Sequence, residues 1–199
     1  MSATKIPGAR GRPRSFDPER AVETAMKLFH ARGYDAVGVA ELSSELGIKP
    51  PSFYAAFGSK AGLFERALQR YAAGEGNVFA HAQATGGNVG AVLERTLLRA
   101  AHVYPRRDGA AGCLVLDGTR NSADPEASAL SAAARKASCA TIRDFVAAHA
   151  VVRAEEVADF VMIALLGMSA AARDGADETT LRTFAENAGR ALRREFGLE

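Results

Sequence analysis

Residues 39–57 read VAELSSELGIKPPSFYAAF and divide into two short helical segments separated by a tight turn. Val39, Leu42 and Leu46 recur at helical spacing, which gives the first segment one apolar face. Gly47 supplies the backbone freedom that a sharp turn requires. The pattern predicts a helix that begins near residue 39 and ends at this glycine.

The second half of the stretch predicts another helix. Pro50 and Pro51 lack amide hydrogens, so they suit the first turn of a helix and not its interior. Phe53 and Phe57 then lie one turn apart and would face the core, while the residues between them point elsewhere. Two helices joined by a turn that contains glycine match the helix-turn-helix motif, whose second helix enters the major groove of DNA.

Length and composition limit the class of protein. A chain of 199 residues with 48% hydrophobic residues suits one domain or two small ones with an ample core. No apolar run reaches the roughly 18 residues of a membrane span, and the N-terminus has no signal-peptide core, so we expect a cytoplasmic protein without a membrane partner. The sequence has no CxxC and no paired histidines, so we expect neither a structural metal nor a cofactor.

Positive charge is concentrated at the N-terminal end. Residues 1–60 carry nine lysines and arginines against six acids, whereas the remaining residues carry sixteen against seventeen. Residues 1–15 interleave glycine and proline with arginine, which predicts a disordered basic arm. Arg12 and Arg14 in this arm could enter a narrow minor groove. The alternative is a solubilising tail.

A family resemblance rests on positions in and around the motif. They are Gly33 and Tyr34, Val39 to Ile48, Ser52 to Tyr54, Phe57, Ser59 and Lys60, and Leu63 and Phe64. With these residues the chain resembles the N-terminal domain of the TetR family of transcriptional regulators over about residues 16–71.

The resemblance implies an all-α fold of about nine helices in two domains. The expected boundaries are a disordered basic arm at 1–15, a three-helix DNA-binding domain at 16–72, and an effector-binding and dimerisation domain at 73–199. The implied function is that of a ligand-responsive repressor. Such a protein binds a palindromic operator in double-stranded DNA as a homodimer, and a small-molecule effector of unknown identity releases it.

The expected DNA contacts come from the arm and the motif. Lys49 sits at the start of the second motif helix, and Lys60 matches the family's lysine that contacts the DNA backbone. Two positions depart from the family pattern. Val37 and Gly38 replace a capping Thr or Ser pair, and the two prolines replace more polar residues. The candidate DNA-binding residues are Arg12, Arg14, Gly38, Lys49, Pro50, Pro51, Ser52, Tyr54 and Lys60.

Helical patterns continue through the rest of the chain. Asp17-Pro18 and Asp124-Pro125 are each an N-cap followed by a first-turn proline. A helix that begins at Lys60 is expected to run past Gly74 and Gly76 to about residue 82. The short apolar segment at 112–116 has no possible partner strand, so we expect it to be helical or irregular.

The last two predicted helices carry broad apolar faces. If each keeps a spare face, a two-fold axis would build a four-helix dimer interface, as the resemblance implies. A monomeric core is the alternative reading. The candidate interface residues are Val157, Phe160, Val161, Ala164, Leu165, Met168, Leu181, Phe184, Ala188 and Leu192.

The resemblance also places a ligand pocket among the helices of the second domain. The candidate lining residues are Phe79, His81, Val92, Thr96, His102, Tyr104, Leu116 and Phe145. For each of them ordinary core packing is the alternative reading.

Other functions receive less support from the residues. Cys113 and Cys139 could act as a thiol switch or bind Cu(I), although free cysteines usually behave as small buried hydrophobes. A helical binding protein that does not touch DNA is a further alternative. No phosphate loop, nucleophile elbow or metal-ligand cluster indicates an enzyme.

Overall fold

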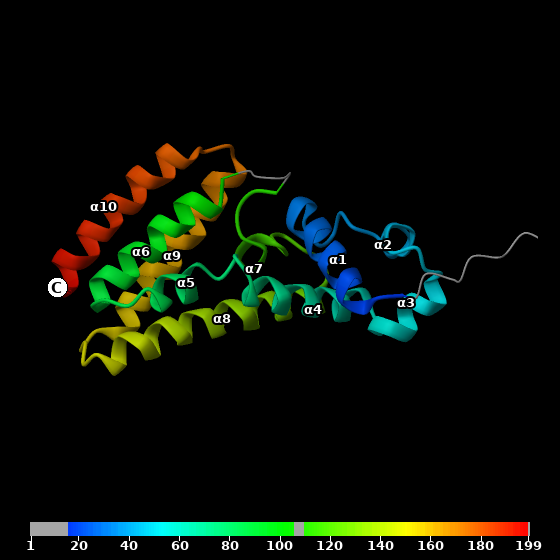
Figure 1. Cartoon of the computed structure of the whole chain (residues 1–199), viewed down its shortest axis with the longest axis horizontal. Coiled ribbons are helices and arrows are strands. Elements are labelled where there is room, and N and C mark those ends of the chain that lie inside the picture. The colour runs from blue at the N-terminus through cyan, green and yellow to red at the C-terminus, as the bar shows by residue number, and fades with distance from the viewer. Residues whose placement is uncertain (1–15, 106–109, 199) are drawn as a thin grey trace, which may run out of the picture.

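The computed structural model describes residues 16–105 and 110–198, so Arg12 and Arg14 lie outside the described residues. Across these two ranges the regular elements are helices, as predicted (Figure 1). They are α1 (Pro18–Arg32), α2 (Val39–Glu45), α3 (Pro50–Phe57), α4 (Lys60–Ala73), α5 (Val78–Ala84), α6 (Val89–Val103), α7 (Leu114–Asp117), α8 (Pro125–Ala148), α9 (Ala154–Arg173) and α10 (Glu178–Phe196). No helix in these ranges is both long and apolar enough to cross a membrane.

Aspartate caps fix where three of the long helices begin. Asp17 accepts hydrogen bonds from the amides of the first turn of α1. Asp124 does the same for α8, and Asp177 caps α10. These side chains satisfy amides that have no partner within the helix, so the starts predicted at Asp17 and Asp124 are confirmed.

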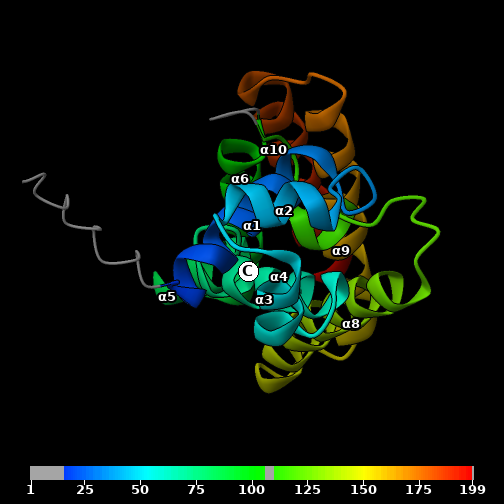
Figure 2. The ribbon, with the colours of Figure 1, turned by 90° about the vertical axis from the view of Figure 1, so that its right-hand side faces the viewer.

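The helices form two groups that occupy opposite ends of an elongated molecule (Figure 1). In this view α1, α2 and α3 lie at the right-hand end, and α6, α9 and α10 lie at the left-hand end. Figure 2 looks onto the right-hand end and places α1, α2, α3 and α4 in front of the other helices. Helix α4 links the first group to the rest of the molecule, because it packs on α1 and also on α7 and α8.

The core of the first group is aromatic. The rings of Phe29 and Phe64 meet edge to face, with their centroids 5.2 Å apart, and Tyr34 stacks on Phe29 at 5.7 Å. All three side chains are buried. Such pairs add to the free energy of burial because the positive edge of one ring meets the negative face of the other.

The predicted continuation of α4 to residue 82 is wrong, because the chain forms two helices there. Helix α4 ends at Ala73, and Asn77 starts α5 by accepting the amide of Ala80 at 3.0 Å. The Asn77 side chain also donates to the carbonyl of Ala72 at 2.9 Å. This asparagine therefore satisfies both the end of one helix and the start of the next, which favours a break over a continuous helix.

Hydrogen bonds join the first group to the segment around α7. The amide of Tyr34 donates to the carbonyl of Gly118 at 2.8 Å, and its hydroxyl donates to Asp124 at 2.8 Å. Asp35 accepts from the hydroxyl of Ser122 at 2.7 Å. Nearby, His30 Nε2 donates to the carbonyl of Gly112 at 3.0 Å. These bonds connect the first group of helices to the segments on either side of α7.

Acidification is expected to weaken this junction through His30. Burial lowers the pKa of this imidazole below its ordinary value of 6.5, and Arg173 contributes to the shift. The unfolded chain therefore binds a proton before the folded chain does. The contribution to stability is intact above about pH 6.5 and decreases as the pH falls below it, by at most about 1.4 kcal/mol per pH unit.

Urea unfolding between pH 7.5 and 5.5 would measure this effect. The control is His30→Gln, whose amide can donate the same hydrogen bond but does not titrate. We expect the wild-type free energy of unfolding to decrease more steeply over this interval than that of the variant. Parallel pH profiles for the two proteins would contradict the assignment.

Candidate nucleic-acid interface and cavity

Helices α2 and α3 form a helix-turn-helix. Gly47 adopts a left-handed conformation with φ of 64°, and the amide of Ile48 closes the turn on the carbonyl of Ser43 at 3.0 Å. Phe53 is fully buried and Phe57 is 5% exposed. These two rings anchor α3 to the first group of helices, as the sequence predicted, and this leaves the opposite face of α3 in solvent.

That opposite face carries most of the candidate DNA-binding residues. Lys49, Pro50, Pro51 and Ser52 are exposed, and Tyr54 is 51% exposed. Each is free to meet a ligand as large as a duplex.

Gly38 is also exposed, at the start of α2, where no side chain caps the helix. The absence of a cap agrees with the departure from the family pattern. The role of these residues in DNA binding remains a prediction.

Lys60 differs from the other candidates because it contacts its own protein. Its ammonium lies 3.9 Å from the centroid of the Tyr34 ring, a cation–π contact. Partial burial lowers the pKa of Lys60, against the opposing effect of Asp35 and Asp124. The lysine predicted to bind the DNA backbone therefore lies at the junction described above.

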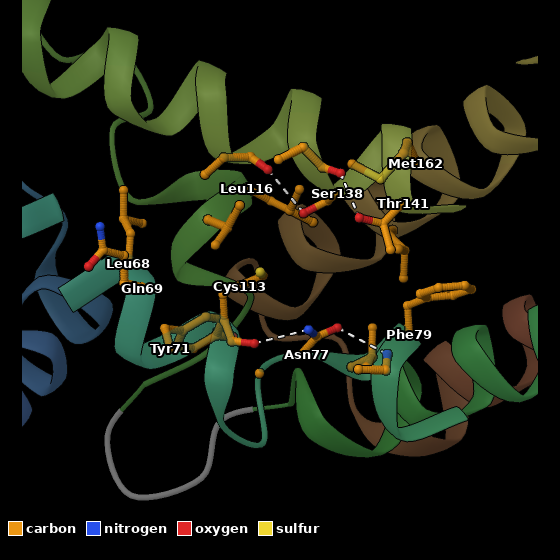
Figure 3. A pocket seen from close by; sticks show the side chains of 18 of the residues that line it. Leu68, Gln69, Tyr71, Asn77, Phe79, Cys113, Leu116, Ser138, Thr141 and Met162 are labelled. Carbon is orange, nitrogen blue, oxygen red and sulfur yellow. Dashed lines mark hydrogen bonds between the residues drawn. The ribbon is translucent and has the colours of Figure 1, made fainter. Parts of the chain in front are cut away.

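A cavity of about 490 Å³ opens between α4 and α5 on one side and α8 on the other (Figure 3). Residues of α7 and α9 close it. Three of the predicted lining residues, Phe79, Tyr104 and Leu116, line this cavity. Its volume lies within the range of about 300–1,000 Å³ that is typical of small-molecule sites.

The other five predicted lining residues are absent from its wall. Val92 and Thr96 are buried on α6, where the Thr96 hydroxyl donates to the carbonyl of Val92 at 2.8 Å. His102 pairs with Glu178 on α10, and His81 lies 3.9 Å from Glu75. Phe145 packs on Phe79, with ring centroids 5.5 Å apart. The sequence pattern identified positions that are buried or helical, but it did not identify which helix faces meet at the cavity.

Several residues of the wall were not predicted. They include Tyr71, Asn77, Cys113, Ser138, Thr141 and Met162. The one local signal was the position of Tyr71 on the apolar stripe of α4, since a buried tyrosine needs a partner for its hydroxyl.

Comparison with known proteins identifies the family. A family model described as bacterial regulatory proteins, tetR family, matches residues 21–67. The HTH-type transcriptional repressor BdcR of Escherichia coli (strain K12) is 44% identical to this chain over 183 residues, which cover 92% of each protein. The chain belongs to the TetR family.

Two further TetR-type proteins agree with this assignment over nearly the whole chain. The HTH-type transcriptional repressor ComR of Escherichia coli (strain K12) is 32% identical, over 93% of this chain and 91% of its own length. A structure of the TetR family transcriptional regulator CifR, a cysteine mutant complexed with 26-base-pair operator DNA, is 31% identical. Its TM-score is 0.79, and the match covers 91% of this chain and 99% of CifR. The chain is therefore a transcriptional regulator.

Most of the residues predicted to form a dimer interface in this TetR-family protein pack inside its own chain. Of the ten, only Phe160 and Phe184 retain substantial exposure, and Phe184 is 45% exposed. Ile163 on α9, which the sequence analysis did not select, is 68% exposed. A second copy could therefore meet these three residues, while the other eight stabilise the monomer core.

Neither cysteine of this TetR-family protein has the environment of a reactive thiolate. Cys113 is buried, and burial raises the pKa of its thiol. Cys139 is partly exposed, and desolvation together with the carboxylate of Asp159 raises its pKa as well. Reactive cysteines instead lie beside cations that lower the thiol pKa, so this geometry disfavours the thiol-switch reading. The described residues also contain no group of three metal-ligating side chains.

Thiol labelling would test this difference in accessibility. We expect Cys139 to react with a disulfide reagent in the native protein, and Cys113 to react at least about ten-fold more slowly because it is buried. The variant Cys139→Ser isolates Cys113, and urea should restore its reactivity. Fast labelling of native Cys139→Ser would return the thiol switch to consideration.

Proposed function

We propose that this regulator represses transcription by binding a palindromic operator as a homodimer, and that a small molecule in its cavity releases it. The observation that carries the proposal is the arrangement of α3, which two buried phenylalanines anchor while Lys49, Ser52 and Tyr54 remain exposed. The repressor names of BdcR and ComR and the operator complex of CifR support it. Such a protein acts where the chromosome lies, in the cytoplasm.

In this proposal α3 enters the major groove. Lys49 at its start meets a phosphate or a guanine edge, and Ser52 and Tyr54 orient the helix and read bases. Pro51 and Ala55 on the same exposed helix offer apolar contacts, which suit the methyl group of thymine. The arm with Arg12 and Arg14 adds affinity from the minor groove, and Lys60 adds a backbone contact.

The proposed homodimer forms through α9 and α10. Ile163 and Phe184 expose large apolar side chains on these helices, next to the partly buried Phe160. A two-fold axis that pairs these helices with those of a second copy would cover both residues. The two DNA-binding domains of such a dimer, called heads below, would meet half-sites about 34–36 Å apart, or a multiple of that spacing.

Release of the operator would follow from the helices that contact both the cavity and the helix-turn-helix. Tyr71 on α4 and Leu116 on α7 both line the cavity, and α7 is followed directly by Gly118, whose carbonyl accepts the amide of Tyr34. A ligand that fits only one arrangement of α4 and α7 would change the spacing of the heads. By thermodynamic linkage, operator binding weakens the ligand by the same factor.

Duplex binding across a salt series tests the proposal. The probe is a set of short duplexes from the promoter region of the protein's own gene, and we expect tight binding to one palindromic segment. Lys49→Ala should weaken this binding and, if the lysine meets a phosphate, reduce the slope of log K against log salt by about 0.9. Lys136→Ala is the matched control, because Lys136 is exposed on α8, outside the helix-turn-helix. Equal weak binding to every duplex would refute the proposal.

Sedimentation of charge variants tests the dimer. Ile163→Glu places a carboxylate in the proposed interface, where it would lose water without gaining a partner, and should convert the dimer into a monomer. Val152→Glu is the control, because Val152 is 98% exposed in the loop that precedes α9. A dimer that tolerates Ile163→Glu, or dissociates equally with Val152→Glu, would contradict the assignment of this face.

A further inference from the structure

We propose that the cavity selects an uncharged, mostly apolar molecule that carries one oxygen acceptor, and that the phenol of Tyr71 donates a hydrogen bond to this oxygen. The inference deepens the proposed function, because it names the chemical class of the effector. It rests on the wall of the cavity, on the hydrogen bonds already made there, and on one hydroxyl that makes none (Figure 3).

The described residues that line the cavity offer no cation to an acidic ligand. Among the described residues that line it, Glu65 is the one charged side chain, and it is exposed at the rim. The deeper wall is apolar, with Leu116, Ile142 and Met162 among its residues. A carboxylate or an ammonium group in this interior would lose its hydration without gaining a counter-charge, which is strongly unfavourable.

Three other polar side chains of the wall already have hydrogen-bond partners. The hydroxyl of Ser138 donates to the carbonyl of Ala134 at 3.0 Å, and that of Thr141 donates to Ala137 at 2.9 Å. Asn77 uses both ends of its amide to cap the two helices on either side of it. The amides of Gln69 and Gln83 lie at the exposed rim.

The hydroxyl of Tyr71 differs from these three groups. The side chain is 7% exposed and lines the cavity beside Cys113, yet its oxygen has no hydrogen-bond partner among the residues that the structure describes. The Cys113 thiol and the Leu114 backbone are among its polar neighbours, but neither meets the geometry of a hydrogen bond with it. Burial raises the pKa of Tyr71 well above its ordinary value, so the phenol keeps its proton and remains a donor.

Packing holds this donor in place. A Cβ atom at Gly76 would lie 2.2 Å from Cε1 of the Tyr71 ring, so the backbone of the α4–α5 link packs directly against the ring. The imidazole of His30 meets the same ring edge to face at 5.1 Å. The hydroxyl is therefore preorganised and costs little conformational entropy when a ligand binds.

A buried donor without a partner favours ligands that supply an acceptor. Leaving such a group unpaired costs more than a typical hydrogen bond contributes, so a site built in this way rejects an analogue that lacks the oxygen. Ketones, aldehydes, esters and ethers of modest size have the required combination of apolar surface and one acceptor.

Four probes of nearly equal size separate the effect of the oxygen acceptor from the effect of a charge. Benzylacetone has the ketone, butylbenzene has a methylene in its place, hydrocinnamate has a carboxylate, and phenylpropylammonium has an amine. Isothermal titration of the full-length protein would measure the four affinities. We expect benzylacetone to bind most tightly, and the anion and the cation to bind at least about ten-fold more weakly.

The variant Tyr71→Phe tests the hydrogen bond itself, because it removes the hydroxyl and keeps the ring. It should weaken benzylacetone by about ten-fold and leave butylbenzene unchanged. Ser138→Ala is the matched control, because it removes a hydroxyl of the wall that already has a partner, and it should change neither affinity. The melting temperature of each variant verifies that it is folded.

Three results would overturn the inference. They are tighter binding of either charged probe, equal effects of Tyr71→Phe on the ketone and the hydrocarbon, and no binding of any probe at millimolar concentration. The test needs no DNA, so its outcome is separate from that of the proposed function. If benzylacetone binds through Tyr71 but leaves the operator complex intact, the ligand class stands and the release mechanism fails.

Discussion

The hydrogen bonds that Tyr34 and Asp35 make with the segment between α7 and α8 hold the helix-turn-helix against the second half of the molecule. Tyr34 contributes through both its amide and its hydroxyl, and its ring also receives the ammonium of Lys60. Each bond is modest by itself, since folding replaces hydrogen bonds to water with hydrogen bonds inside the protein. Together they fix the direction in which α3 points, and this direction determines whether two heads can fit one operator.

Helix α7 can transmit a change of position from the cavity to the helix-turn-helix because a buried carboxylate holds α7 against α9. Asp117 is 4% exposed and pairs with Arg120 at 2.7 Å, with Arg173 at 3.4 Å and with the hydroxyl of Ser169. That hydroxyl also accepts the amide of Cys113 at 2.7 Å. A buried charge is tolerated only with such partners, so this short helix moves together with α9 or not at all. Helix α7 thus lines the cavity and also positions the carbonyl of Gly118 that accepts the amide of Tyr34.

The cavity and the DNA-reading face therefore depend on the same contacts although they lie on different helices. Tyr71 faces the cavity from α4, while the N-terminal half of α4 packs on α1 through Phe64 and Phe29. A ligand that contacts Tyr71 therefore acts on a helix that also supports the helix-turn-helix. The apolar faces of α9 and α10 have a different role, because most of their large side chains are used inside the chain and only a few remain for a partner.

The sequence by itself determined the features that depend on neighbours within a few residues. The aspartate caps with their prolines, the glycine turn at 47 and the buried spacing of Phe53 and Phe57 all follow from local geometry. Only the tertiary structure decided which helix faces converge. It placed Tyr71 and Asn77 in the cavity wall, turned Val92 and Thr96 into the core, and brought Lys60 onto the ring of Tyr34. The physical reason is that helical periodicity shows that a face is buried but not what it is buried against, which depends on contacts between residues distant in the chain.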